Sequence, residues 1–199
     1  MQVDSEDVVE VIKIPIKRIA ELRGDADSTI SMLEKNLQIK IDVDDEGTVE
    51  LQGASLNVFF ASPVIRAIGR GFEPRIALKL KDDEYGFRII DLRDYCKTPN
   101  AMTRIKGRVI GEKGKSKEII EIEAECNLAI WGHTVGIIAP LEVLDIATNA
   151  IFKLIEGQPH AAVYLYLEKN KRRRKQDEIR DKAKMWDAQS THKNVSKKE

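Results

Sequence analysis

The feature that most constrains the fold is an internal repeat, offset by 86 residues from Thr48 to Thr134. TVELQGASLNVFFASPVIRAIGRG, from Thr48, and TVGIIAPLEVLDIATNAIFKLIEG, from Thr134, both open with Thr-Val and close on a glycine. Upstream, RIAELRGDAD at 18–27 aligns with IKGRVIGEKG at 105–114. Two amphipathic helices can resemble each other by chance, but agreement over several elements favours a duplication. The chain must therefore fold from a unit that can be built twice.

Each copy is predicted to have the order β-α-α-β-β-α, from apolar alternation, helical periodicity and the Gly, Pro and Asp residues between elements. A short helix is expected at 75–80, and a further helix after Pro159. In the first copy the expected elements are 8–14, 16–23, 28–36, 37–43, 48–52 and 55–71. In the second copy they are 85–92, 101–110, 115–126, 128–131, 135–139 and 140–156.

Charge is divided unequally between the two halves, although the net charge of the 199-residue chain is zero. Residues 1–100 carry 14 Lys and Arg against 19 Asp and Glu, a net charge of −5. Residues 101–199 carry 19 against 14, a net charge of +5. If the protein binds a polyanion, the second half is expected to do so.

The strongest functional motif is RIKGRVIGEKGKSK at 104–117, which contains six Lys or Arg and one carboxylate. Gly111 and Gly114 enclose Glu112 and Lys113 in a turn between two predicted helices. Glycine lets a backbone approach a ligand closely, and the start of a helix offers unpaired amides and a positive dipole end. The motif therefore favours binding of a nucleic-acid backbone.

A β-α-α-β-β-α unit with Ile-Gly-x-x-Gly between its first two helices, here residues 110–114, resembles the type I K-homology (KH) domain. The resemblance implies an α+β fold of two tandem type I KH domains. Each would have a three-stranded antiparallel sheet with helices on one face, and a basic helix would follow at the C-terminus. The predicted domains are 1–71, with a degenerate loop, and 85–157, with an intact one. A linker at 72–84, the basic helix at 158–187 and a disordered tail at 188–199 complete the chain.

The resemblance extends over residues 8–176, because GRVIGEKGKSK is followed by NLAIWG, an apolar helix and VYLYLEKNKRRRK. Together these segments are similar to the archaeal partner-of-Nob family of small-ribosomal-subunit assembly factors. That family implies binding of single-stranded ribosomal RNA near the 3′ end of the small-subunit rRNA. It also implies contact with the endonuclease that trims this end and with the alpha subunit of translation initiation factor two.

In a KH domain the GxxG loop clamps about four nucleotides while the bases lie against an apolar groove. The basic residues could instead simply lie on a solvated helix face, and the apolar residues could instead simply pack in the core. Trp131, at the end of a strand, is equally compatible with base stacking and with packing. The predicted RNA-binding residues are Arg104, Lys106, Gly107, Arg108, Ile110, Gly111, Glu112, Lys113, Gly114, Lys115, Ile130, Lys171, Arg172, Arg173 and Arg174.

The corresponding loop of the first copy is Gly24-Asp25-Ala26-Asp27. Two carboxylates would face the place of a phosphate, so this copy is not expected to grip nucleic acid by its loop. It is expected to pack on the second copy or to bind protein. Asp25 and Asp27 have a simpler alternative role, which is to cap the helix that follows.

Other function classes find little support in the sequence. Cys96 and Cys126 lack metal-binding spacing, no apolar run approaches about 18 residues, and no catalytic constellation or cofactor motif is present. We therefore expect a cytoplasmic binding protein without a cofactor, a membrane partner or enzyme activity. Three alternatives stay open. They are a protein-interaction scaffold that recruits the endonuclease or initiation factor with incidental RNA contact, an RNA-cleaving enzyme, and a single-stranded DNA binder.

Overall fold

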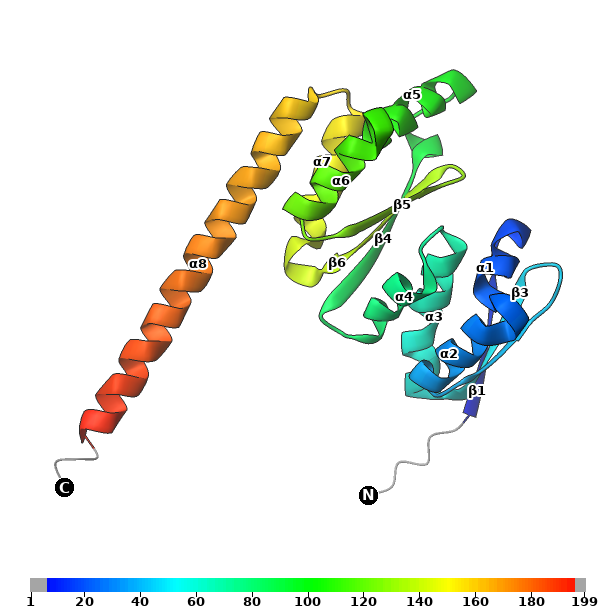
Figure 1. Cartoon of the computed structure of the whole chain (residues 1–199), viewed down its shortest axis with the longest axis horizontal. Coiled ribbons are helices and arrows are strands. Elements are labelled where there is room, and N and C mark those ends of the chain that lie inside the picture. The colour runs from blue at the N-terminus through cyan, green and yellow to red at the C-terminus, as the bar shows by residue number, and fades with distance from the viewer. Residues whose placement is uncertain (1–6, 196–199) are drawn as a thin grey trace.

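A computed structural model describes residues 7–195, with side-chain surroundings up to residue 184. It contains two β-α-α-β-β-α units followed by one long helix (Figure 1), in agreement with the predicted element order. The first unit consists of β1 (Asp7–Lys13), α1 (Ile19–Arg23), α2 (Ser28–Leu37), β2 (Lys40–Val43), β3 (Thr48–Ala54) and α3 (Ser55–Gly69). The second consists of β4 (Tyr85–Asp91), α5 (Pro99–Ile110), α6 (Lys115–Glu123), β5 (Asn127–Trp131), β6 (Thr134–Pro140) and α7 (Leu141–Ile155).

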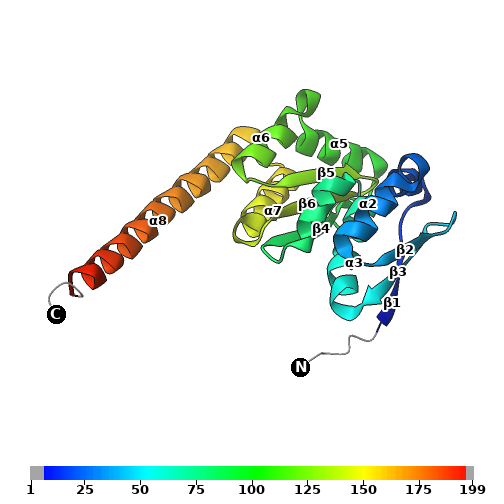
Figure 2. The ribbon, with the colours of Figure 1, turned by 60° about the horizontal axis from the view of Figure 1, so that its bottom comes forward.

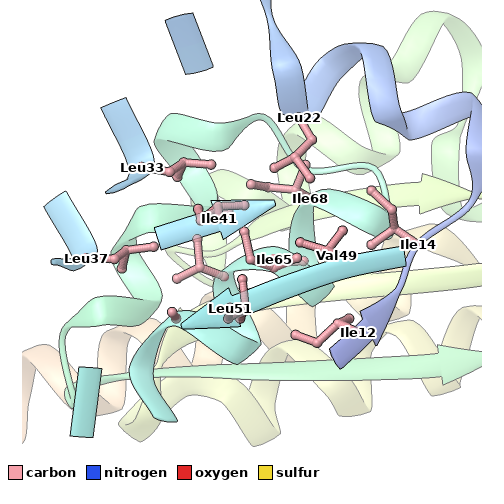
Figure 3. Packing of buried hydrophobic residues seen from close by; sticks show 14 of the residues in the cluster. Ile12, Ile14, Leu22, Leu33, Leu37, Ile41, Val49, Leu51, Ile65 and Ile68 are labelled. Atoms are coloured by element: carbon pink, nitrogen blue, oxygen red, sulfur yellow. The ribbon is translucent and has the colours of Figure 1, made fainter. Parts of the chain in front are cut away.

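Each unit builds one antiparallel three-stranded sheet with its third strand in the middle, in the orders β1-β3-β2 and β4-β6-β5. In the first sheet the burial alternates, because Val49 and Leu51 are buried while Glu50 and Gln52 are exposed. This period of two leaves one face of the sheet in solvent. The other face supports the core of the unit, which joins strand residues to the three helices (Figure 3). Its labelled members include Ile12, Leu22, Leu33, Leu37, Ile41, Val49, Leu51, Ile65 and Ile68.

The middle strand of the second sheet is buried on both faces. Residues 134–139 of β6 are all buried. Helices α5, α6 and α7 cover one face, and the first unit covers the other, where Phe72 packs edge-on against Phe87 with ring centroids 5.9 Å apart. A Cβ at Gly136 would lie 2.6 Å from the Phe72 ring, so glycine is required for this approach. The molecule is therefore layered as sheet, helices, sheet and helices (Figure 1).

The segment 72–84 is a packed part of this interface rather than a free linker. It contains α4 (Pro74–Ala77) and a 3-10 helix (Leu78–Lys81). Ala77 and Leu80 are buried in the same hydrophobic cluster as Ala129 and Ile138 of the second unit. The short helix agrees with the sequence prediction, but its apolar side chains join the two units because the back of the second sheet needs a cover.

The last helix, α8 (His160–Val195), begins against the second unit and extends well beyond it (Figures 1 and 2). Val163 and Leu167 are buried in the second core. The prediction that the helix ends at 187 and that disorder follows is wrong for 188–195, because no Gly or Pro interrupts the helix after Pro159. Residues 196–199 of the predicted tail lie outside the described residues. Side-chain pairs one turn apart support the polar part of α8, such as Glu168 with Arg172 at 2.6 Å.

Both cysteines are free thiols. Cys96 is half-buried and Cys126 is buried, and burial raises the pKa of the Cys126 thiol to about 12. In the described part of the chain, no helix is long and apolar enough to cross a membrane. Within the same residues, no group of three or more His, Cys, Asp and Glu side chains is placed to hold a metal ion.

Candidate nucleic-acid interface

The loop between α5 and α6 is held in a conformation that requires glycine at its first position. Gly111 has φ 75° and ψ 176°, a region that only glycine adopts readily. A Cβ at Gly111 would lie 2.7 Å from the backbone nitrogen of Ser116, so the loop is packed against the start of α6. At Gly114, with φ 82°, no atom lies within 4 Å of the position of a Cβ. The second glycine therefore leaves an open surface.

At the start of α6, beside this open surface, backbone N–H groups are available to bind a ligand. Gly114 is the N-cap residue, and no side chain caps the helix. Lys113 and Lys115 are exposed on either side of it. Free amides, the positive end of the helix dipole and two lysines form a site suited to a phosphate.

Ser116 is a contact residue of the loop that the sequence analysis did not assign. It is only 2% exposed, its Oγ has no hydrogen-bond partner among the described residues, and it lies under Gly111. The signal in the sequence was Thr29, which stands 87 residues earlier and contacts Gly24 in the first unit. A small hydroxyl residue at this position lets each loop turn tightly against the next helix.

Several predicted site residues surround the loop on accessible surface. Arg104 and Gly107 are exposed on α5, whose Ile105 and Val109 point into the core. Gly107 has no neighbour within 4 Å of a Cβ position, so it is not required for helix packing. Of the other predicted residues, Lys106 is half-buried, Ile110 is 36% exposed and Glu112 is exposed, while Ile130 is half-buried on β5 and packs against the second core.

Arg108 has a structural role instead of the predicted phosphate contact. Its Nε donates to the carbonyl of Leu154 at 3.0 Å, and a terminal nitrogen donates to Gln158 at 2.5 Å. These carbonyls belong to the C-terminus of α7, where a cation is favourable. Arg18 makes the same contacts in the first unit, to the carbonyls of Ile68 and Phe72, both at 2.9 Å. In each unit the guanidinium thus ties an early helical segment to the carbonyl groups at the end of the last helix.

The basic segment of α8 divides into an inner and an outer face. Arg174 is 18% exposed and bridges Glu125 and Glu142, at 3.2 and 2.8 Å. Lys171 donates to the carbonyl of Ile122 at 3.1 Å and is also occupied within the chain. Both side chains therefore attach α8 to the body, and a contact of these two with RNA stays a prediction.

Arg172 and Arg173 are the outward pair, with side chains 75% and 84% exposed. Nε2 of His160, at the start of α8, lies 2.9 Å from the carbonyl oxygen of Arg108. The first residue of α8 is therefore close to the end of α5 that leads into the loop. At 1.5 Å per residue, Arg172 is about 18 Å further along the helix. Only an RNA that extends past the loop could reach this pair.

Trp131 packs at the junction of the two units. Its Cβ lies against Gly71, where an added Cβ would be 2.9 Å away, and Arg18 stacks over its ring at 5.4 Å from the centroid. In the structure Trp131 therefore has the packing role that was the alternative to base stacking.

The first unit's loop has the same backbone form as the second but a more negative charge, with two aspartates against one glutamate and one lysine. Gly24, Ala26 and Asp27 have φ values of 67°, 49° and 57°, against 75°, 52° and 82° at Gly111, Lys113 and Gly114. Asp27 is the N-cap residue of α2, where a negative charge is favourable, although neither aspartate side chain accepts a hydrogen bond from the helix. Asp25 stands where the second loop has Glu112, which is also exposed, and Asp27 stands where the second loop has the open Gly114. Lys113 of the second loop takes the place of Ala26.

Comparison with known proteins agrees with this geometry. Residues 86–172 match the model of the second KH domain of PNO1, a eukaryotic-type (type I) KH domain. A KH domain-containing protein of Methanocaldococcus jannaschii is 38% identical over 187 residues, covering 92% of this chain and 81% of that protein. The chain belongs to the PNO1/Dim2 family of KH-domain RNA-binding proteins of ribosome biogenesis.

Solved structures of Dim2 give the same result. The crystal structure of Dim2p from Pyrococcus horikoshii has a TM-score of 0.76 and 38% identity, covering 81% of this chain and 99% of that one. A complex of a/eIF2alpha, aDim2p and rRNA from the same organism matches with a TM-score of 0.78 and 37% identity, over 85% and 97% of the two chains. The pre-rRNA-processing protein PNO1 of Chaetomium thermophilum is 27% identical, over 78% of this chain and 64% of that protein.

Proposed function

We propose that this protein consists of two tandem type I KH domains, at 1–71 and 85–157, and binds single-stranded ribosomal RNA through the second during small-subunit assembly. Family membership supports the RNA and the process. The observation that carries the assignment to the second unit is the contrast between its loops. Both have the same backbone form, but only the loop at 111–114 contains a lysine, Lys113, and has a glycine with open space at its last position where the first loop has Asp27.

The RNA backbone would lie over Gly114 and the first turn of α6, between Lys113 and Lys115. Arg104 and Lys106 would extend the phosphate contacts along α5, and Ile110 and Ile130 would face the bases. Glu112 would turn outward, away from the phosphates. Arg172 and Arg173 would contact only a longer RNA.

The target we propose is the 3′ region of the small-subunit rRNA, on the basis of the resemblance to the partner-of-Nob family. The complex containing aDim2p, a/eIF2alpha and rRNA supports rRNA and the initiation-factor alpha subunit as partners. Contact with the 3′-end endonuclease is proposed from family resemblance alone. A cytoplasmic location and action by binding rather than catalysis stay predictions.

Gly114→Asp is the sharpest test, because Asp27 shows that this loop accommodates an aspartate at the same position without collision. Fluorescence anisotropy with a labelled single-stranded RNA from the rRNA 3′ end should show affinity reduced by about tenfold or more, since a carboxylate replaces open space at the phosphate site. Asp27→Asn, the matched control, should leave affinity unchanged. Equal affinity for wild type and Gly114→Asp would remove the loop from the RNA site.

Salt dependence tests the same contact independently. Each phosphate neutralised contributes about 0.7 to the slope of log affinity against log salt for single strands. Lys113→Gln should therefore reduce the slope by about 0.7, whereas Lys35→Gln, a control on the first unit, should leave the slope unchanged. A slope that is the same in wild type and Lys113→Gln would exclude a phosphate contact by this lysine.

A further inference from the structure

A groove runs along α3 between the two units, away from the RNA loop. One face of α3 forms its floor, with Phe59, Pro63, Arg66 and Arg70 spaced three to four residues apart. Two cavities of about 590 and 540 Å³ make up the groove and share Arg66 and Ile89. We call this feature the seam groove.

The two walls of the seam groove are edge strands. Residues 11–15, at the end of β1 and just after it, line the groove consecutively. β1 pairs with β3 on one side only within the described sheet. From β4, by contrast, every second residue lines the groove, namely Tyr85, Phe87 and Ile89. One wall thus offers backbone hydrogen-bonding groups and the other an apolar surface.

Large apolar side chains of the groove lie in solvent. Phe59 is 70% exposed and Ile89 is 40% exposed, and Val11 beside them is 58% exposed. Contiguous exposed apolar surface of this kind marks interaction sites in soluble proteins.

Charge differs between the two ends of the groove. Glu10 and Asp83 line the end next to Phe59, and Lys13 and Arg70 line the other. Arg66, between them, is paired with Glu10 at 3.2 Å. The ion pairs found in the described chain involve none of Asp83, Lys13 and Arg70.

We propose that the seam groove binds an extended segment of a partner protein. The segment is apolar in its middle, basic at the end beside Glu10 and Asp83, and acidic at the end beside Lys13 and Arg70. From Phe59 to Arg70 the floor is about 17 Å long, which matches about five residues of extended chain. The free edge of β1 supplies backbone hydrogen bonds to such a segment, and the apolar wall receives alternate side chains.

The charge distribution favours protein over nucleic acid at this site, because a uniformly negative backbone would have to pass Glu10 and Asp83. The groove also borders β4, whereas Ile130 of the RNA site lies on β5, at the opposite edge of the second sheet. The segment and the RNA can therefore bind at the same time.

The test uses the full-length protein and two acetylated, amidated heptapeptides, KKVFVEE and its reverse EEVFVKK. Titration followed by amide chemical shifts should show saturable binding of one peptide, with changes concentrated at residues 11–15 and 59–70. Phe59→Ser should weaken binding by about tenfold, because it removes the central apolar anchor. Leu165→Ser, an equally exposed leucine on α8, serves as the matched control and should bind as wild type does.

Charge reversal sharpens the result. Lys13→Glu/Arg70→Glu should weaken binding of the heptapeptide that binds the wild type and strengthen binding of KKVFVKK. If the double variant does not fold, Arg70→Gln should give an intermediate loss of affinity. The proposal is overturned if neither heptapeptide shifts these residues, or if Phe59→Ser and Leu165→Ser have equal effects. It is also overturned if Phe59→Ser lowers RNA affinity, since the groove would then belong to the RNA site.

Discussion

The two loops of this protein share a backbone and differ in what they present to a ligand. At 24–27 and at 111–114 the chain turns through the same sequence of dihedral angles, against Thr29 and Ser116 respectively. The first loop, Gly-Asp-Ala-Asp, exposes two carboxylates, whereas the second, Gly-Glu-Lys-Gly, exposes one carboxylate, one lysine and an open glycine. Each unit uses the turn to connect its first two helices. The contrast indicates that the shape of a GxxG-type loop is a folding requirement, while under the proposed function its charge selects the unit that binds RNA.

The largest expected effect tests whether the two turns are equivalent in folding. Gly111→Ala and Gly24→Ala should each lower the free energy of unfolding by about 3 kcal/mol, because both leave an alanine in a glycine-only region and push its Cβ into the next helix. Gly114→Ala, which occupies the left-handed region in open space, should cost about 1 kcal/mol. Urea unfolding measures all three. Clearly different costs for Gly111→Ala and Gly24→Ala would break the equivalence.

The next effect separates folding from binding on α5. Arg108→Ala should lower the free energy of unfolding by about 2 kcal/mol, because two partly buried carbonyls lose a charged donor. Its RNA affinity should change less than twofold. Arg104→Ala should keep its stability within about 0.5 kcal/mol and lose about threefold in RNA affinity. Urea unfolding and anisotropy on both variants check this, and the reverse pattern would restore Arg108 to the RNA site.

The smallest expected effect tests whether the negative charge of the first loop is the reason that this loop does not bind RNA. Asp25→Lys/Asp27→Gly should raise RNA affinity by only about twofold. Arg23, the nearest cation, is already held by the carbonyl of Val43 at 2.7 Å and by Asp45 at 3.1 Å. Anisotropy with the same RNA measures the gain, with Asp45→Asn as control. A gain above tenfold would mean that the charge of the loop accounts for most of the difference in RNA binding between the units.

Much of the architecture could be predicted from local patterns. The alternating strand at 48–52 and the glycines that follow α1, α3, α5 and α7 placed the elements of both units within a few residues of their observed positions. The sequence of β6 also indicates that this strand is buried on both faces. Residues 134–140 read TVGIIAP, without the alternation of TVELQGA in β3, and a continuous apolar run indicates a strand covered on both faces.

The roles of individual cations could not be predicted in the same way. Helical spacing shows that Arg104 and Arg108 share a face of α5, but it does not show that the C-terminus of α7 lies beside Arg108. Similarly, Lys171 to Arg174 form one basic run in the sequence. Only the placement of α6 and α7 against α8 divides this run into two residues that hold the helix and two that face solvent.

The sequence by itself determined the repeated unit, the element order and the basic glycine loop, because these depend on neighbours within a few residues along the chain. The tertiary structure alone decided that the units stack through the back of the second sheet, that Trp131 meets Arg18, and that α3 and the two edge strands enclose a groove. These features join residues tens of positions apart. Their contacts follow from how whole surfaces fit together, which no local pattern of residues records.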